Sequence, residues 1–420
     1  MKVLMFGWEL PPFFAGGVGI VCSELLKELA RRDDISVTYV MPFGPKQIKN
    51  QNFKLIIADN LKMKDKIKTK YIPSLLGAYI SKDEYLEKLE GLVRDKDGNV
   101  GMLKDNTLQL YGKNLLQEVY RFSEKAKLIA KDEDFDVIHA HDWTTFPAAE
   151  EASKISGKPF IIHVHITEFD KSGGRGASPD IYAIEKQGME SSDKIIAVSE
   201  VVKKGLVKNY GINPNKIEVV YNAKVNSSDI IEGAFPKFAD NSKVVLFAGR
   251  VTMQKGPEYF IEAAEKVLRF YENVIFIMAG TGDQLKDMIR KTSELGLSDN
   301  FLFHGFYTRS DANKFFKLAD VFVMPSVSEP FGLVPLEAME KGTPAIISKQ
   351  SGCSEILRNT LKVDFWDTDK MANQIVALLN HKSLKKVMSE KGQTEVNSLT
   401  WDEPVRRCVD LYKKVIRDRE

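Results

Sequence analysis

Short apolar runs alternate with longer amphipathic stretches along the whole chain. The runs are rich in Val, Ile and Phe, and the stretches between them repeat apolar residues at helical spacing. Such alternation is typical of parallel sheets covered by helices, so the pattern predicts an α/β fold. The predicted strands lie at residues 3–6, 37–41, 137–139, 160–163, 195–198 and 218–221, and then at 244–248, 274–279, 301–304, 321–324, 345–347 and 361–364.

The strand pattern stops after residue 221 and restarts at Val244, which divides the chain in two. The intervening segment 223–242 is rich in Asn, Ser, Gly and Pro and has no period, as expected of a linker. The length of 420 residues also fits two domains, because one domain ordinarily has ~100 to 200 residues. We therefore expect two Rossmann-like domains facing a central cleft, with a C-terminal helix that crosses back to the first. The predicted boundaries are 1–225 for the N-terminal domain, with a charged insertion at about 59–106, 243–400 for the C-terminal domain, and 401–420 for the helix.

Composition narrows the class of protein. The 60 basic and 58 acidic residues leave a net charge of +2, too small a field to attract nucleic acid. Three widely spaced cysteines give neither a disulfide framework nor a thiolate zinc site, so we expect a cytoplasmic protein. No apolar run approaches the ~18 residues that span a bilayer. The alternating lysines of 62–70 allow peripheral membrane contact, but a solvated charged loop explains them better.

A pair of glycines follows the first predicted strand. Gly16 and Gly17 stand directly before the apolar stretch 20–29, which is expected to be a helix. Backbone N–H groups at a helix N-terminus favour an anion, so the pair is a candidate diphosphate site. A tight strand-to-helix turn would use the same glycines. The G-x-G-x-x-G of dinucleotide oxidoreductases does not occur here, which argues against that class.

The C-terminal domain carries charged residues at the ends of two predicted strands. Arg250 and Lys255 follow the strand 244–248 and are five residues apart in one loop, where they can converge on a diphosphate. Glu329 and Glu337 follow the strand 321–324, the first in a loop and the second on a helix, and can address opposite ends of an extended ligand. Gly332 and Leu333, between the glutamates, offer backbone amides at the helix N-terminus.

These elements together resemble retaining glycosyltransferases of the B fold, the glycogen and starch synthases among them. The resemblance rests on "HAHDW", "FAGRVTMQKGPEYF", "AGTGD" and "PSVSEPFGLVPLEAM" and spans most of the chain. It implies a catalytic set of His165, Arg250, Lys255 and Glu329, with His165 beside the donor sugar. It also implies that Asp142 lies on the acceptor side. The implied donor-binding residues are Gly16, Gly17, Arg250 and Lys255 for the diphosphate, Glu329 for the sugar hydroxyls, Glu337 for the ribose hydroxyls, and Phe331, Gly332 and Leu333 in the same loop.

The resemblance also implies substrates. It favours transfer of glucose from UDP-glucose or ADP-glucose to an α-glucan, with no metal and no further cofactor. The lysine of the bacterial glycogen synthase motif K-x-G-G-L is missing before Gly16, so the nucleotide stays open. Asn222 likewise lacks the glycine and aspartate that follow it in many relatives. Other readings are transfer to another polysaccharide, a lipid or a sugar phosphate, a sugar phosphorylase, and a sugar-nucleotide-binding protein without catalysis.

Two further patterns have competing explanations. His139 with His141, and His163 with His165, are spaced as metal ligands on a strand would be, but the sequence has no matching cysteines or second-shell signals, so a zinc site is not the preferred explanation. Asp367 and Asp369 match a metal-binding D-x-D, but helix capping by Asp367 is the preferred explanation.

For the transfer itself, the resemblance implies attack on the same face as the leaving group. A carboxylate nucleophile from Glu168, Asp170 or Asp142 stays open.

Overall fold

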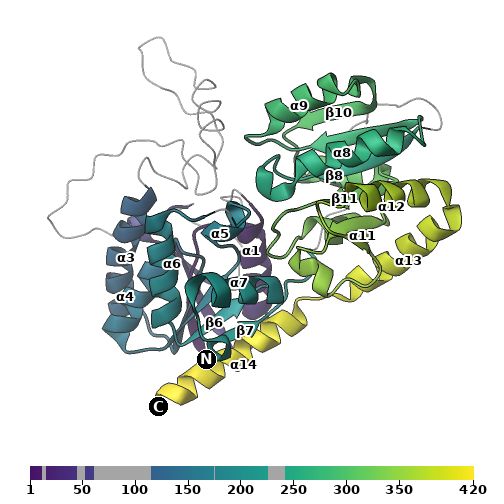
Figure 1. Cartoon of the computed structure of the whole chain (residues 1–420). Helices are drawn as coiled ribbons and strands as arrows, with labels where there is room; N and C mark the ends of the chain where they lie inside the picture. Colours follow the sequence, from purple (N-terminus) through teal and green to yellow (C-terminus); the bar gives the residue numbers. More distant parts are fainter. Residues whose placement is uncertain (12–15, 45–52, 61–114, 175, 226–241) are drawn as a thin grey trace, which may run out of the picture.

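The protein folds into two α/β domains, each built on a parallel sheet (Figure 1). The computed structural model describes residues 1–11, 16–44, 53–60, 115–174, 176–225 and 242–420. The predicted α/β class is therefore confirmed. From residue 61 onward the predicted insertion lies outside the described residues, as do the lysines of 62–70, residues 12–15 before Gly16 and most of the predicted linker.

The N-terminal sheet has the strand order β3-β2-β1-β4-β5-β6-β7. Its central strands β1, β4 and β5 are almost wholly buried, because helices cover both faces of a parallel sheet. The strands are β1 (Lys2–Phe6), β2 (Ser36–Met41), β3 (Lys54–Ile57), β4 (Val137–His141), β5 (Phe160–Val164), β6 (Lys194–Ala197) and β7 (Ile217–Val219).

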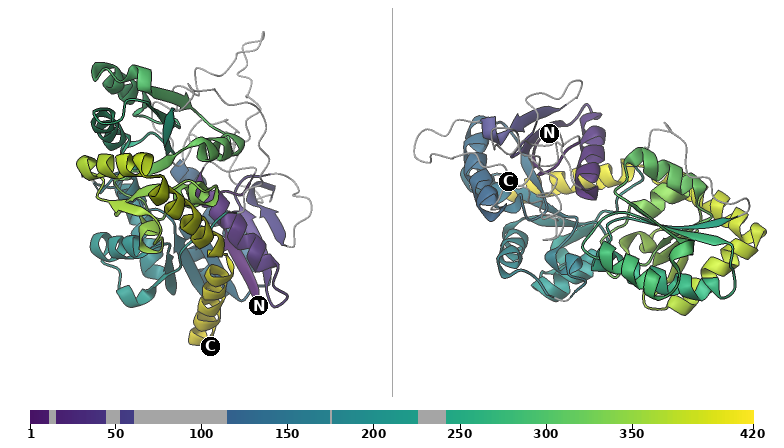
Figure 2. Two further views of the ribbon diagram at one scale, coloured as in Figure 1. Left: turned by 90° about the vertical axis from the view of Figure 1, so that its right-hand side faces the viewer. Right: turned by 90° about the horizontal axis from the view of Figure 1, so that it is seen from above.

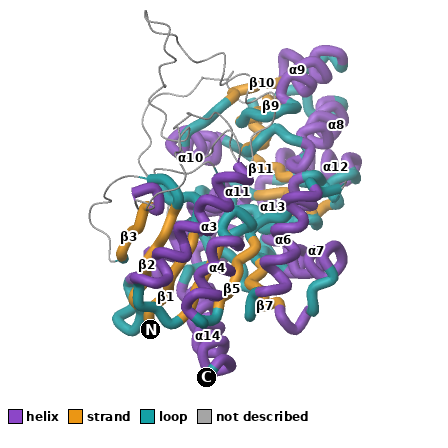
Figure 3. Tube along the Cα trace, turned by 90° about the vertical axis from the view of Figure 1, so that its left-hand side faces the viewer, coloured by secondary structure: helices purple, strands orange, loops and turns teal. Residues whose placement is uncertain are grey.

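Helices α3, α4 and α6 cover one face of this sheet, as Figure 3 shows, and α1 lies against the other with the C-terminal helix. The helices of this domain are α1 (Gly17–Ala30), α3 (Leu115–Asp132), α4 (Phe146–Ser156), α5 (Glu168–Lys171), α6 (Pro179–Ser191) and α7 (Glu200–Tyr210), with the 3-10 turns η1 (Ala58–Asn60) and η3 (Pro214–Lys216).

The C-terminal sheet has the order β10-β9-β8-β11-β12-β13. The strands are β8 (Lys243–Ala248), β9 (Val274–Ala279), β10 (Phe301–Gly305), β11 (Val321–Met324), β12 (Ala345–Ser348) and β13 (Leu361–Val363). The helices are α8 (Pro257–Leu268), α9 (Leu285–Glu294), α10 (Arg309–Leu318), α11 (Val334–Glu340), α12 (Thr368–Asn380) and α13 (Lys382–Ser398), with the 3-10 turns η4 (Met253–Lys255), η5 (Ser298–Asn300) and η6 (Gly352–Glu355).

The last helix, α14 (Asp402–Arg419), returns from the C-terminal domain to the N-terminal domain (Figure 2). It contacts α1 and β4, and its Tyr412 Oη lies 2.6 Å from His139 Nδ1. Arg407 pairs with Glu218, and Arg419 with Asp193 at 3.0 Å. The apolar face that the sequence shows at helical spacing is buried by this docking.

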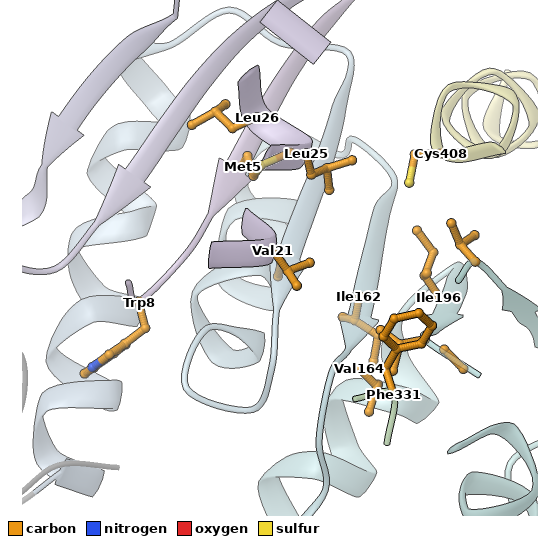
Figure 4. Close-up of a cluster of buried hydrophobic side chains, with 14 of the residues drawn as sticks. Met5, Trp8, Val21, Leu25, Leu26, Ile162, Val164, Ile196, Phe331 and Cys408 are labelled. Atoms are coloured by element: carbon orange, nitrogen blue, oxygen red, sulfur yellow. The ribbon is translucent and has the colours of Figure 1, made fainter. Parts of the chain in front are cut away.

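One apolar cluster continues from the N-terminal sheet into the C-terminal domain. Phe331 belongs to the C-terminal domain, yet Figure 4 shows its ring beside Ile162 and Val164 of β5, and it is 3% exposed. A second cluster fills the other face of the C-terminal sheet. The two domains are thus joined by apolar packing as well as by the chain itself.

Candidate functional site

The start of α1 meets the loop that precedes α11 across the two domains. Gly17 is the first residue of α1, and a Cβ placed on it would lie 3.9 Å from Leu333 Cδ1. Gly16 at the N-cap makes no side-chain hydrogen bond to the helix. Among the described residues, Gly16 therefore offers no capping side chain to the first-turn N–H groups of α1, which suits these groups to an anionic ligand.

The loop after β8 is held against the loop after β11. The backbone oxygen of Gln254 accepts hydrogen bonds from the N–H groups of Val327 at 2.9 Å and Ser328 at 3.4 Å. Gly256 has φ +65°, and a Cβ on it would lie 2.1 Å from the Pro325 carbonyl oxygen, so only glycine permits this approach. The two loops that carry the predicted donor residues therefore form one unit.

Lys255 and Glu329 form an ion pair between these loops. The Glu329 residue is 6% exposed, and Ser326 Oγ donates to the same carboxylate at 3.3 Å. An ammonium group has three N–H donors, so Lys255 can keep Glu329 in place and still bind an anion. Arg250 lies in the same loop and donates from Nη2 to Gln254 Oε1 at 3.2 Å.

The loop from Phe331 to Leu333 can offer main-chain atoms, but not the aromatic ring of Phe331, to a bound donor. The Phe331 ring is buried between the domains, so the predicted contact of this residue with the donor is limited to main-chain atoms. Gly332 has φ +98°, a conformation that favours glycine. Leu333 is the N-cap residue of α11 and faces Gly17.

Glu337 lies in the first turn of α11, one helix turn beyond Leu333. Burial raises the pKa of its carboxyl, and the positive charge of Arg309 opposes that shift. Tyr307 is close enough that the charge of Glu337 adds to the effect of burial in raising the pKa of the Tyr307 hydroxyl. The Glu337 side chain thus lies in a partly desolvated, polar environment next to the loop after β10.

His165 follows the carboxyl end of β5 and is buried with 6% exposure. Burial lowers the pKa of its imidazole to about 3, so the ring is neutral at pH 7. Its Nε2 lies 2.9 Å from His141 Nδ1. The histidine that resembles the family residue is therefore backed by a second neutral histidine.

Asp142 supports the backbone that carries His165. Its Oδ1 accepts the N–H groups of His165 at 2.7 Å and Ile166 at 3.3 Å. Asp142 has φ +56°, the one positive φ at a non-glycine residue in the described chain. At 2% exposure it is an internal support, which differs from the expected placement facing an acceptor.

Asp170 joins the N-terminal domain to the glutamate loop. Its Oδ2 caps its own helix through Thr167, and its Oδ1 accepts Ser328 Oγ at 3.1 Å. Burial raises the pKa of Asp170, and the charge of Glu329 adds to the shift. Sequence reasoning named Asp170 as an open nucleophile but missed its partner Ser328, because no local signal connects residues of different domains.

The two patterns with competing explanations resolve differently. Asp367 accepts the backbone N–H of Lys370 at 3.0 Å, so helix capping is confirmed for this residue. The histidines of the H-x-H pairs gather in one buried cluster with Cys22.

In the part of the chain that the structure describes, no helix is long and apolar enough to cross a membrane.

Comparisons with known proteins agree with this geometry. The family model described as Glycosyl transferases group 1 matches residues 232–395, and that of Glycosyltransferase Family 4 matches residues 103–223. The chain is 28% identical to an uncharacterized glycosyltransferase of Methanocaldococcus jannaschii, covering 98% of both sequences. It is 25% identical to the glycogen synthase of Mycobacterium tuberculosis, over 86% of this chain and 80% of the relative.

A solved structure shares the fold. The solved structure of sucrose-phosphate synthase from Thermosynechococcus elongatus superposes with a TM-score of 0.72 at 18% identity, and the match covers 99% of each chain. At that identity the likeness concerns the fold, which is that of two facing α/β domains. With both family models matched along the chain and the predicted donor loops joined at the domain boundary, the protein belongs to the group 1 glycosyltransferases of the B fold, which use a nucleotide-sugar donor.

Proposed function

We propose that the protein is a retaining hexosyltransferase that moves glucose from a nucleoside diphosphate to an α-glucan. The observation that carries the donor assignment is the Lys255–Glu329 pair at the meeting of the β8 and β11 loops. A cation beside a buried carboxylate offers charge to a diphosphate and hydrogen-bond acceptors to sugar hydroxyls. Likeness to a glycogen synthase along most of the chain supports the glucan acceptor.

The mechanism follows from what these side chains can do. The bond between the anomeric carbon and the diphosphate oxygen breaks, and the acceptor oxygen bonds to the same face of that carbon. The acceptor proton passes to the departing diphosphate oxygen. Arg250 and Lys255 stabilise the charge that develops on the leaving group, and the N-terminus of α1 adds its positive end from the other domain.

Attack on the same face is favoured because the candidate nucleophiles are engaged elsewhere. Asp142 holds two backbone N–H groups, Asp170 holds Thr167 and Ser328, and Glu168 pairs with Lys171 at 2.9 Å. A carboxylate nucleophile must present a free oxygen to the anomeric carbon. Neutral His165 can instead hydrogen-bond the sugar as it leaves the phosphate.

The test is to incubate the enzyme with UDP-glucose, ADP-glucose and other nucleotide sugars, with and without maltooligosaccharides. Nucleotide release that depends on acceptor, together with an α-linked elongated glucan by NMR, is the expected result. Release of nucleotide only with a sugar phosphate or a lipid acceptor would replace the glucan by that acceptor. A β-linked product would overturn retention.

A further inference from the structure

Four histidines project from the same face of the N-terminal sheet. His139 and His141 lie two residues apart on β4, His163 is the register partner of His141 on β5, and His165 follows two residues later. Side chains two residues apart on a strand share a face, which explains the grouping. All four are buried, with exposures of 0%, 1%, 2% and 6% respectively.

Three of the rings hold nitrogens close to one another, with ring planes inclined by 32° between His139 and His141, 12° between His139 and His163, and 32° between His141 and His163. The ring centroids of His139, His141 and His163 are 4.4, 5.4 and 5.3 Å apart, and each ring offers a nitrogen within 4.8 Å of the other two. Among the residues that the structure describes, Nε2 of His139, Nε2 of His141 and both nitrogens of His163 are buried without a hydrogen-bond partner. Each unsatisfied buried polar atom costs ~1 to 3 kcal/mol, so something must offset the cluster.

The remaining nitrogens of two rings are already engaged. His139 Nδ1 lies 2.6 Å from Tyr412 Oη on α14, and His141 Nδ1 lies 2.9 Å from His165 Nε2. When Nδ1 of each ring carries the proton, Nε2 is left with a lone pair. A metal-ligating histidine ordinarily has its other nitrogen fixed in this way by a neighbour.

We propose that His139, His141 and His163 bind a zinc ion inside the N-terminal domain. A Zn–N bond of ~2.0 to 2.1 Å and tetrahedral angles place ring centroids about 5 Å apart, close to the separations in the cluster. Imidazole nitrogens suit zinc and disfavour magnesium and calcium, which select oxygen ligands. The ion is structural, because the three residues are almost fully enclosed.

The surroundings suit a buried cation in two respects. The three rings are buried in the apolar interior, an environment that favours the neutral imidazole through which histidine ligates a metal. The carboxyl groups of Asp142 and Glu9 are both buried, and both interact electrostatically with Cys22, whose Sγ belongs to a second group with His141 and His165. Carboxyl groups are the kind of neighbour that a buried cation requires.

The ion would also act on the donor site without touching substrate. With zinc on His141 Nε2, the Nδ1 proton of that ring must point to His165 Nε2. His165 would then keep its own proton on Nδ1, in one fixed tautomer. This inference depends on the histidine cluster alone and not on the identity of donor or acceptor.

The first experiment measures metal in the full-length protein without an affinity tag. We expect about one zinc per chain after growth in zinc-supplemented medium, retained through gel filtration in EDTA and released on unfolding. Refolding with Co²⁺ should give the visible d–d absorption of a tetrahedral site. Zinc below about 0.1 equivalent per chain, both after such growth and after refolding with zinc, would overturn the proposal and leave a water-bridged imidazole cluster.

Variants identify the ligands. His163→Gln should lower the zinc content at least about tenfold, whereas His381→Ala, an exposed histidine of the C-terminal domain, should leave it unchanged. Cys22→Ala should also keep the metal. Loss of the metal in this variant would overturn the three-histidine ligand set in favour of the group formed by Cys22, His141 and His165. If His163→Gln does not fold, the Tm of wild-type protein refolded with and without zinc decides, because a bound ion must raise it.

Discussion

At the scale of single residues, the Lys255–Glu329 pair is the feature on which the proposed chemistry depends. Glu329 is buried enough that an unpaired charge there would be costly, so the ammonium of Lys255 both balances the carboxylate and fixes its direction. The same ammonium is in the loop that carries Arg250. A substitution at either partner therefore changes the site as well as the charge.

Replacing Lys255 by Met should lower kcat by ~10² or more, because a cation on the leaving diphosphate matters most when charge develops there. The apolar stem of methionine preserves much of the packing. The measurement is kcat at saturating donor, with folding checked by circular dichroism. The matched control is Lys349→Ala, which removes a surface ion pair with Asp364 and should keep wild-type turnover. Normal kcat in Lys255→Met would take this lysine out of the site.

The two glutamates should fail in different ways. Glu337→Gln should raise the donor Kd more than it lowers kcat, because a contact with ribose is made equally in the ground state and the transition state. Glu329→Gln should lower kcat with a smaller change in donor Kd, since its contacts with the sugar tighten as the bond to phosphate breaks. Donor titration and saturated turnover for both variants separate the roles, and the reverse pattern would mean that the assignments are exchanged.

The buried histidines should make the fold sensitive to acid. The pKa of His139 is about 3 when folded and 6.5 when exposed, so the unfolded chain binds a proton first as the pH falls. The stability that His139 contributes is complete above pH 6.5 and declines below it, by about 2 kcal/mol at about pH 5. Asp142, whose pKa burial raises to about 7, acts in the opposite direction.

A comparison with the variant His139→Phe isolates the pH-dependent stability that His139 contributes. Between pH 6.5 and about 5, the free energy of unfolding of wild-type protein that has been unfolded and refolded without metal should fall by about 2 kcal/mol more than that of the variant treated in the same way. Urea titrations at several pH values give both curves. Parallel curves for the two proteins would show that His139 titrates alike in the folded and unfolded states.

At the scale of elements, a C-terminal side chain caps an N-terminal helix. Glu355 accepts the backbone N–H groups of Glu200 at 2.9 Å and Val201 at 2.8 Å, at the start of α7. Ser199 caps the same helix and also donates to the Pro330 carbonyl at 2.6 Å. The N-terminus of α7 is therefore a fixed point between the domains.

Glu355→Ala should weaken this contact between the N-terminus of α7 and the C-terminal domain. The control is Glu395→Ala, because Glu395 accepts the N–H groups of Arg358 and Asn359 in the same way but within one domain. Both variants should lose ~1 kcal/mol of stability, the ordinary value of a cap. Only Glu355→Ala should increase the radius of gyration measured by small-angle scattering. Equal scattering from the two variants would show that this contact does not set the domain arrangement.

Much of the element pattern was predictable, and the exceptions have physical reasons. Buried strands such as β9 and β11 occupy the predicted residues, because continuous apolar runs specify them. β3 was missed since it is a short edge strand with partly exposed residues, and α13 since most of its surface is in solvent. The Phe331 contact and the Ser328–Asp170 bond join distant parts of the chain, which local patterns cannot show.

At the scale of the whole molecule, the two domains are held by α14, by the Phe331 packing and by the joint at α7. The predicted donor residues come from both sides of that boundary, with Gly16 and Gly17 on one side and the Lys255–Glu329 pair on the other. Domain closure can therefore assemble the diphosphate site and exclude water from it. This arrangement supplies positive charge from side chains and a helix end.

Transfer should accordingly proceed without an added divalent cation. Among the residues that the structure describes, the groups able to ligate a metal both lie in the histidine cluster, and neither includes the carboxylate that pairs with Lys255. We expect the initial rate in EDTA to stay within about twofold of the rate with Mg²⁺ or Mn²⁺, because the cations on the diphosphate are Arg250 and Lys255. The buried zinc, being enclosed, should survive brief chelation. If EDTA does lower the rate, the ion that restores it distinguishes the two sites. Recovery with Mg²⁺ or Mn²⁺, which prefer oxygen ligands, would indicate a metal at the diphosphate. Recovery with zinc alone would indicate the histidines. Inactivation by EDTA that Mg²⁺ or Mn²⁺ reverses would contradict a donor site neutralised by protein cations.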